Sequence, residues 1–150
     1  MKVFNFRLET LLHLREITRD KALGNYAKAI NVRQEKEKAL QESRSFLEEL
    51  QLHIGQKRMD SFSGSSEESF DLSVKTAKER IIDAHKNLQQ SLQSEAAKKR
   101  IYLKADSEYK SLLKLKEKQR EEHVRTQSLK EERELEDIIG GRFVFNNISK

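Results

Sequence analysis

Apolar residues recur through the first third of the chain at spacings of three, four or seven residues and their sums. This spacing is typical of the buried seam of a coiled-coil helix. A second periodic stretch begins near residue 69 and ends at a pair of glycines, Gly140-Gly141. The pattern predicts two long helices, at about residues 6–57 and about 69–139. The seam residues of the first are Leu12, Ala22, Tyr26, Ala29, Leu40, Leu47, Leu50 and Ile54.

Two segments interrupt the periodic pattern. Residues 60–70 read DSFSGSSEESF, with five serines and a glycine, which predicts a loop at about residues 58–68. Ser66 or Ser69 is a suitable N-cap for the second helix. The glycine pair follows a charged helical run, which is the usual signal for a helix end, and it leaves residues 140–150 as a C-terminal tail.

The two predicted helices can cover each other as an antiparallel hairpin. With a turn centred near residue 63, position i faces roughly position 127 − i. Polar seam residues then meet polar partners, because Arg33 and Lys36 face the group Ser91, Ser94 and Glu95. The apolar layers pair Ile54 with Val74, Leu50 with Ala77, Leu47 with Ile81, Leu40 with Leu88, Tyr26 with Ile101 and Tyr102, Ala22 with Ala105, and Leu12 with Leu115.

This register favours one all-α coiled-coil domain over residues 1–150, made of two long helices that form an antiparallel hairpin. A parallel dimer of long rods is the alternative, but it would leave the serine-rich break unexplained. The chain has 35% hydrophobic and 37% charged residues, no proline and only five glycines. This is the composition of long helices. Disorder is disfavoured because 30 basic and 25 acidic residues are interleaved and can pair at helical spacing.

Several classes of function find no support in the residues. There is no cysteine, so no thiolate metal site or disulfide is expected. His13, His53, His85 and His123 lie far apart, without companions at metal-ligand spacing. There is no glycine-rich phosphate loop, and two helices offer no cleft that could enclose a reaction. We expect neither an enzyme nor a cofactor nor a small-molecule substrate. No apolar window approaches the ~20 residues of a membrane span, and the N-terminus does not resemble a secretory signal.

Charge is distributed unevenly along the second helix. Residues 98–120 contain nine basic and three acidic residues, whereas residues 121–137 contain seven acidic and three basic ones. A solvated helix face is the simplest interpretation. Docking of the basic part into an acidic protein ring or groove is the sharper one. Polyanion binding comes third, and nucleic acid is not an expected partner, since no aromatic residues interleave as a stacking platform.

Aromatic residues gather near both termini of the chain. In the predicted hairpin, Phe4 and Phe6 lie at the same open end as Phe143 and Phe145. They would either cap that end against fraying or contact a partner. The sequence leaves both interpretations open.

The opening FNFRLETLLHLRE, residues 4–16, resembles the N-terminal signature of the FliJ family of flagellar export components. Near the other end, RELEDI at residues 133–138, followed by Arg142 and Phe143, is similar to that family's C-terminal segment. The resemblance covers the whole chain in length, loop position and both ends.

The resemblance implies a non-enzymatic, stalk-like coiled coil of the flagellar type III export apparatus. Its implied partners are the flagellar export ATPase hexamer, the export gate membrane protein and the export chaperones, and the free chain is expected to be a monomer. The implied location is cytoplasmic, peripherally associated with the inner face of the cell membrane at the flagellar base. Alternatives are the equivalent stalk of a virulence-type III secretion system, a basic coiled coil that binds a polyanion, and a chaperone escort that binds unassembled subunits but never the ATPase.

The resemblance also implies two sets of contact residues. The gate-facing set lies beside the loop and consists of Phe46, Leu50, Val74, Ile81 and His85. The ATPase-facing set lies at the terminal end and consists of Phe4, Phe6, Arg7, Leu8, Leu11, Leu135, Ile138, Phe143 and Phe145.

Overall fold

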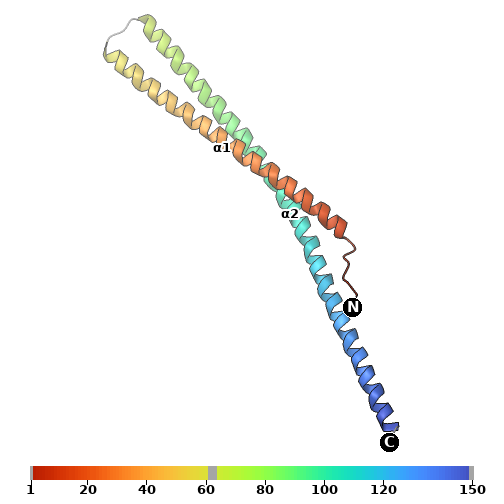
Figure 1. Ribbon diagram of the computed structural model, residues 1–150. Helices are drawn as coiled ribbons and strands as arrows, with labels where there is room; N and C mark the ends of the chain where they lie inside the picture. The colour runs from red at the N-terminus through yellow and green to blue at the C-terminus, as the bar shows by residue number, and fades with distance from the viewer. Residues whose placement is uncertain (1, 61–63, 149–150) are drawn as a thin grey trace. The chain divides into compact units, whose positions relative to one another are not determined.

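The computed structural model describes residues 2–60 and 64–148, and within them it contains two long helices (Figure 1). Helix α1 spans Glu9–Met59 with 51 residues, and helix α2 spans Gly64–Ile148 with 85 residues. The two helices pack against each other, which confirms the predicted all-α helical hairpin. Within the described residues, no helix is both long and apolar enough to cross a membrane.

Helix α1 begins slightly later than predicted, at Glu9 instead of residue 6. The N–H of Glu9 donates a hydrogen bond of 3.2 Å to the carbonyl of Phe6, so the chain turns just before the helix. The side chain of Phe6 is only 7% exposed. Glu9 stands in the first turn of α1, where the helix dipole favours an acid.

The turn between the helices is shorter than predicted. Helix α1 continues to Met59, and α2 begins at Gly64, five residues before the predicted start. Ser66 and Ser69 therefore lie inside α2, and the prediction that one of them caps its N-terminus was wrong. Glu67 favours the early start, because an acid in the first turn complements the helix dipole and because it accepts a hydrogen bond from Arg58 of α1. Residues 61–63 of the predicted loop lie outside the described residues.

The prediction that Gly140-Gly141 ends the second helix was also wrong. Helix α2 runs through both glycines to Ile148, so residues 140–148 are helical instead of a separate tail, and residues 149–150 lie outside the description. A glycine stops a helix when it adopts a left-handed conformation, and neither glycine has such a backbone angle. Each costs the helix about 1 kcal/mol relative to alanine, and the chain has no proline to add a steric break.

The chain forms two compact units, and both helices run through both of them. One unit contains Met1–Arg19 and Lys104–Lys150, and the other contains Asp20–Leu103. The expectation of a single domain stays a prediction.

Within the unit of residues 20–103, contacts between α1 and α2 confirm the predicted register (Figure 1). The rings of Tyr26 and Tyr102 meet edge to face with centroids 6.2 Å apart. Arg33 forms an ion pair of 2.7 Å with Glu95, one of its predicted polar partners. Both pairs of residue numbers add to 128, one more than the predicted 127, and the direction is antiparallel.

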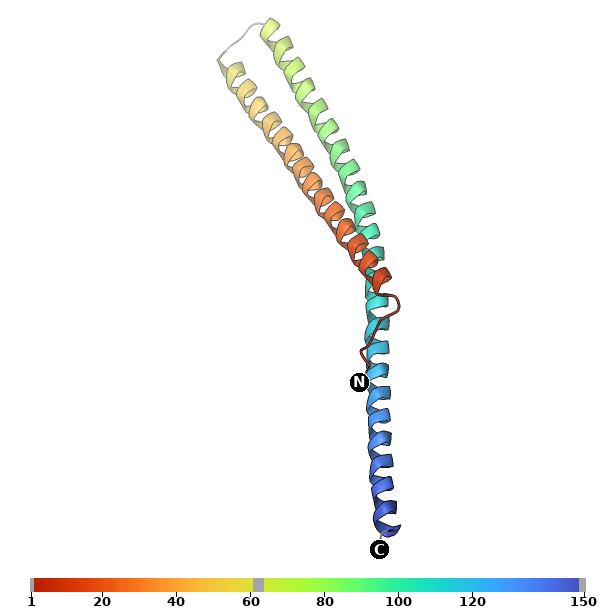
Figure 2. The same cartoon turned by 45° about the vertical axis from the view of Figure 1, so that its right-hand side comes forward.

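Within the other unit, polar contacts hold a similar register. Figure 2 shows the start of α1 beside α2 in this unit. Glu9 pairs with Lys116 at 2.8 Å, and Arg15 pairs with Glu108 at 2.7 Å. Their residue numbers add to 125 and 123. The guanidinium of Arg19 lies 4.3 Å from the centre of the Tyr109 ring, at a distance suited to a cation–π contact.

The predicted seam of α1 is confirmed by burial. Leu12, Ala22, Ala29, Leu40 and Ile54 are buried. The remaining three seam residues, Tyr26, Leu47 and Leu50, are half-buried. On α2, Ala77 is 2% exposed and Ala105 is 6% exposed, and the polar Ser91 is buried with its hydroxyl donating to the Leu88 carbonyl.

The glycine pair offers a test of the long α2. Replacing Gly140 or Gly141 with alanine should increase helicity near the C-terminus, because a Cβ at either position meets no atom within 4 Å and alanine favours the helix by about 1 kcal/mol. Hydrogen exchange of residues 135–148 should slow in both variants. Faster exchange would mean that these glycines adopt a left-handed conformation that alanine resists.

Candidate functional site

The candidate site is a set of exposed apolar surfaces, because a two-helix hairpin has one seam and leaves many apolar residues outside it. Among the described residues, no group of three or more His, Cys, Asp or Glu side chains is arranged to hold a metal ion. Three surfaces are notable: a groove near the turn, a second groove farther along the hairpin, and the free end of α2.

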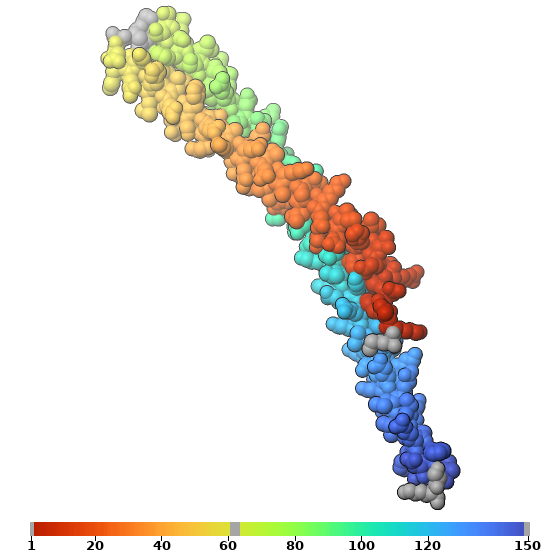
Figure 3. Space-filling view, in the orientation of Figure 1, coloured from red at the N-terminus to blue at the C-terminus, as the bar shows by residue number. Residues whose placement is uncertain are grey.

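The first surface, here called the Phe46 groove, lies between α1 and α2 near the turn, in the unit of residues 20–103. Figure 3 shows the side chains of the two helices meeting in this part of the hairpin. Phe46 is 49% exposed and borders two adjoining shallow hollows, which also share Ala77 and Arg80. The hydroxyl of Ser43 donates to the carbonyl of Ala39 in its own helix. The groove is lined by Ala39, Glu42, Ser43, Phe46 and Leu50 of α1 and by Leu72, Ser73, Thr76, Ala77 and Arg80 of α2.

The structure separates the five predicted gate-facing residues. Phe46 and Leu50 line the Phe46 groove together. Val74 lines a different hollow, beside Asp71 and Ile82. Ile81 is half-buried at a seam position, and His85 is exposed outside the grooves described here.

Sequence reasoning missed the α2 side of the Phe46 groove, which is formed by Leu72, Thr76 and Arg80. A signal was present, since Leu72 is a large apolar residue outside the seam row, and it is 65% exposed. The heptad pattern identifies seam residues, but it does not reveal which of their neighbours face the same side of the hairpin.

The second surface, here called the tyrosine groove, lies in the same unit and was not predicted. Its lining is almost wholly apolar apart from the Lys99 side chain. Leu23 and Leu103 are about half exposed, at 46% and 51%. The edge-to-face pair of Tyr26 and Tyr102 forms its floor. The lining residues are Leu23, Tyr26, Ala27, Ile30, Lys99, Tyr102 and Leu103.

The third surface, here called the terminal helix, is the stretch of α2 at residues 128–148. Every described residue in it is exposed. At 100° per residue, the apolar side chains from Leu135 to Phe145 cover about half of the circumference. The members of this face are Leu135, Ile138, Ile139, Phe143 and Phe145, which are 55–69% exposed.

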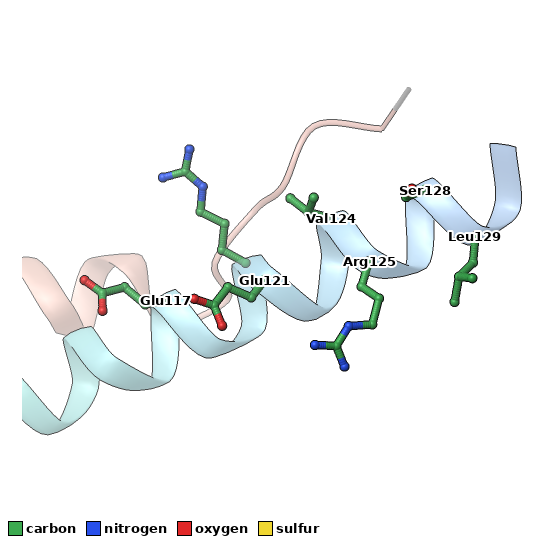
Figure 4. Close-up of a pocket in the computed structure, with 7 residues that line it drawn as sticks. Glu117, Glu121, Val124, Arg125, Ser128 and Leu129 are labelled. Carbon is green, nitrogen blue, oxygen red and sulfur yellow. The ribbon is translucent and has the colours of Figure 1, made fainter. Parts of the chain in front are cut away.

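A shallow hollow precedes the terminal helix on α2. All its lining residues come from α2 (Figure 4). Most of them are charged or polar, and Val124 and Leu129 are the apolar members. Both are at least half exposed, at 59% and 50%. An exposed apolar row therefore extends from residue 124 towards the C-terminus.

The predicted ATPase-facing residues also fall into two groups. At the N-terminus, Phe6 is buried, Leu8 is half-buried, and Phe4 packs beside the His123 ring with centroids 5.6 Å apart. A ring nitrogen of His123 also lies 3.0 Å from the carbonyl oxygen of Lys2. Arg7 is exposed, and Leu11 is 38% exposed.

The C-terminal group is open, because Leu135, Ile138, Phe143 and Phe145 all lie on the terminal helix. Phe143 comes 20 residues after His123 on one helix, which amounts to about 30 Å. The expectation that Phe143 and Phe145 lie beside Phe4 and Phe6 was therefore wrong, because α2 does not end at the glycine pair. The N-terminal aromatics pack on α2, whereas Phe143 and Phe145 do not cap that contact.

Polar contacts fix the hairpin beside these surfaces. Arg33 donates to Glu37 of its own helix at 2.8 Å as well as pairing with Glu95 of α2. The hydrogen bond that Arg33 donates to Glu37 raises the pKa of Arg33 above its ordinary value, and the negative charges of Glu37 and Glu95 add to the effect. A permanently charged guanidinium thus holds both helices in register between the two grooves.

The comparison with known proteins identifies a family. A family model described as "Flagellar FliJ protein" matches residues 4–145. No curated protein matches the chain, and no solved structure matches it.

The burial pattern predicts which residues of the gate-facing set can be changed without loss of stability. Phe46→Ser should shift the free energy of unfolding by no more than about 0.5 kcal/mol, because the ring is half exposed. Ile81→Ser should cost about 1–3 kcal/mol, since it removes apolar burial at a seam position. Urea unfolding followed by circular dichroism measures both. Equal losses would mean that Phe46 belongs to the core.

Proposed function

The chain belongs to the FliJ family of flagellar proteins, and from this membership we propose that it is the stalk-like coiled coil that binds the export ATPase hexamer. Membership of this family supports a component of flagellar type III export, and a non-catalytic role is part of the proposal. The finer proposal is that the terminal helix contacts the ATPase ring, while the Phe46 groove contacts the membrane-embedded export gate. Export chaperones are further proposed partners, and the proposed location is the cytoplasmic face of the cell membrane at the flagellar base.

The exposed terminal helix is the observation that supports ATPase binding. It comprises residues 128–148, about 32 Å of helix. The helix exposes a broad apolar face that α1 does not cover, and a contiguous apolar face on a protein surface usually marks an interaction site. Helix-in-groove docking uses this kind of face, with anchors at spacings of three and four residues. Leu135, Ile138 and Ile139 have this spacing.

The proposed mechanism is thermodynamic. If the terminal helix contacts several ATPase subunits in the closed ring but fewer when the subunits are separate, the chain binds the ring more tightly than it binds the separate subunits. The assembly equilibrium then shifts by that difference in binding free energy. ATPase turnover would increase because the active ring becomes more populated.

The Phe46 groove supports a second contact, with the export gate. Phe46 presents a half-exposed aromatic ring beside Leu72 and Arg80. Aromatic side chains and arginine are enriched among residues that dominate binding energy. The groove and the terminal helix belong to different compact units, so one chain carries two separate candidate contact surfaces.

The first functional prediction concerns the terminal helix. The triple variant Leu135→Ser, Ile138→Ser, Phe143→Ser should weaken binding to the cognate export ATPase by about a hundredfold or more, because each buried side chain contributes about 1.5–3 kcal/mol. The stimulation of ATPase turnover and of hexamer formation should fall with it. Turnover assays and mass photometry of the mixed proteins measure the two effects.

A matched triple variant controls for the general loss of apolar surface. Leu52, Met59 and Ile82 are 66–90% exposed and lie in the other unit, so their replacement by serine should leave ATPase stimulation unchanged. The proposal fails if the wild-type chain leaves the oligomeric state and turnover of the ATPase unaltered. It also fails if both triple variants act alike.

The second functional prediction concerns the gate. Phe46→Ser should weaken binding to the cytoplasmic part of the export gate protein by about tenfold, because it removes an exposed aromatic anchor, while stimulation of the ATPase stays normal. The control is Leu52→Ser, because Leu52 lies near the turn but outside the Phe46 groove. Surface plasmon resonance of the full chain measures binding. Normal gate binding by the Phe46 variant would remove this groove from the proposal.

A further inference from the structure

The seam between α1 and α2 admits a second register, and from this we propose that α2 can slide along α1 by one heptad. Seven residues of α-helix correspond to about 10 Å. The ion pair between Arg33 and Glu95 is the contact that favours the register seen in the structure. The proposal concerns motion within the hairpin, and it does not depend on the function proposed above.

The seam of α2 near the turn repeats itself after seven residues. Its members have the spacing of a heptad seam, and all of them are buried or half-buried except where the seam ends. A shift by one heptad therefore brings each position of α1 opposite a residue of similar size. The members from the turn onwards are Val74, Ala77, Ile81, Ala84 and Leu88.

The apolar layers of the hairpin survive such a shift. Facing residue numbers, which add to about 128 in the structure, would add to about 135. Each apolar residue of α1 near the turn then exchanges one apolar partner for another, and the seam stays apolar there. Ile54 would exchange Val74 for Ile81, Leu50 would exchange Ala77 for Ala84, and Leu47 would exchange Ile81 for Leu88.

Glu95 is the residue that distinguishes the two registers. Its side chain is 18% exposed and pairs with Arg33 at 2.7 Å. In the second register Glu95 would face Leu40, which is 5% exposed. A carboxylate placed against a buried leucine loses its charged partner and much of its hydration, so the second register is the less populated one. Arg33 keeps its pair with Glu37 in both registers, because the two residues lie on the same helix.

The serine-rich start of α2 supplies the length that a slide requires. Movement of α2 towards the turn adds seven residues to the connection between the helices. Residues 64–70 read GSSEESF, and glycine and serine favour a helix less than alanine does. Unwinding these seven residues would move the start of α2 from residue 64 to residue 71, close to the start near residue 69 that the sequence predicts.

The contacts of residues 64–70 with α1 oppose this unwinding only weakly. Glu67 pairs with Arg58, and both side chains are at least 40% exposed. The ring of Phe70 meets the ring of His53 edge to face, with centroids 6.5 Å apart. Exposed ion pairs contribute at most about 1 kcal/mol to stability, so this turn of helix can open without loss of the seam.

Ion pairs in the other unit also belong to the first register. Glu9 pairs with Lys116 and Arg15 pairs with Glu108, and each of these side chains is at least 30% exposed. They add to the preference set by Glu95. A partner that binds one register more tightly than the other would therefore move α2 along α1. Shifts of helix register occur in microseconds to milliseconds.

Engineered disulfides in the full chain test the proposal, because the chain contains no cysteine of its own. The pair Ser43→Cys, Ala84→Cys has residue numbers that add to 127 and reports the register of the structure. The pair Ser43→Cys, Ser91→Cys adds to 134 and reports the second register. In the structure, Ser43 and Ser91 are one heptad out of step, about 10 Å along the helices, which is too far for a disulfide. The rate of intramolecular closure under mild oxidation is measured on non-reducing gels.

Both pairs should close in the monomer, the 43–91 pair more slowly than the 43–84 pair. A third pair, Ser43→Cys, Lys98→Cys, is two heptads out of step and controls for general opening of the hairpin. It should close at least about tenfold more slowly than the 43–91 pair, because a slide by one heptad does not bring these positions together.

Replacement of Glu95 should shift the balance between the registers. Glu95→Leu removes the pair with Arg33 and lets an apolar residue face Leu40, so closure of the 43–91 pair should accelerate by about tenfold. Glu95→Gln removes only the charge and should act in the same direction with a smaller effect. The matched control is Glu79→Leu, which replaces an exposed acid of α2 in the same unit and should leave closure unchanged.

Three outcomes would overturn the proposal. A 43–91 pair that stays reduced in the wild-type background and in Glu95→Leu excludes the second register. Equal closure of the 43–91 and 43–98 pairs shows that the hairpin opens instead of sliding. Equal effects of Glu95→Leu and Glu79→Leu show that Glu95 does not set the register. Circular dichroism and rapid closure of the 43–84 pair confirm that each variant forms the hairpin.

Discussion

The structure depends on a single narrow seam between two helices. Each helix has one partner, so each can bury only one face. Among the described residues, half of the eight buried apolar residues are alanines, namely Ala22, Ala29, Ala77 and Ala105. Small side chains let the helix backbones approach closely, but each contributes little apolar area. The hairpin is therefore stabilised by many small apolar contacts along the seam, and a shift in the register of the two helices would disturb all of them. The Arg33–Glu95 pair and the Glu9–Lys116 pair act against such a shift, because each places opposite charges together in one register only.

The same constraint explains why the surface is rich in possible contacts. A chain that buries one face per helix leaves its other apolar residues outside, and these are not scattered evenly. Phe46 and Leu72 lie together near the turn, Leu23 and Leu103 lie together beside the tyrosine pair, and the apolar face of residues 135–145 has no covering helix. A hairpin with one seam thus presents several distinct apolar surfaces to solvent.

The sequence was informative where periodicity decides the outcome. The seam of α1 and the pairing of Tyr26 with Tyr102 followed from spacing and from one assumed turn position, because antiparallel helices tolerate few registers. The sequence was less informative where the local preference of one residue is opposed by the rest of the helix. Gly140 and Gly141 are ordinary stop signals, but a helix ends at a glycine only when the backbone turns left-handed, and spacing does not reveal that choice. The burial of Phe6 and the α2 side of the Phe46 groove depend on which way residues beside the seam face. That requires the three-dimensional packing of both helices.

The difference in length between the helices has the most direct consequence for function. Helix α2 has 85 residues and α1 has 51. The terminal helix therefore has no part of α1 to pack against, and the seam does not stabilise it. It avoids the cost of nucleation because it continues a helix that is already formed, yet two glycines weaken it and its apolar face stays in water. A partner that covers this face stabilises the helix as well as binding it, so part of the binding free energy is used to order residues 135–148. The affinity of the terminal helix for its partner is lowered by that amount, and the helix dissociates from the partner more easily.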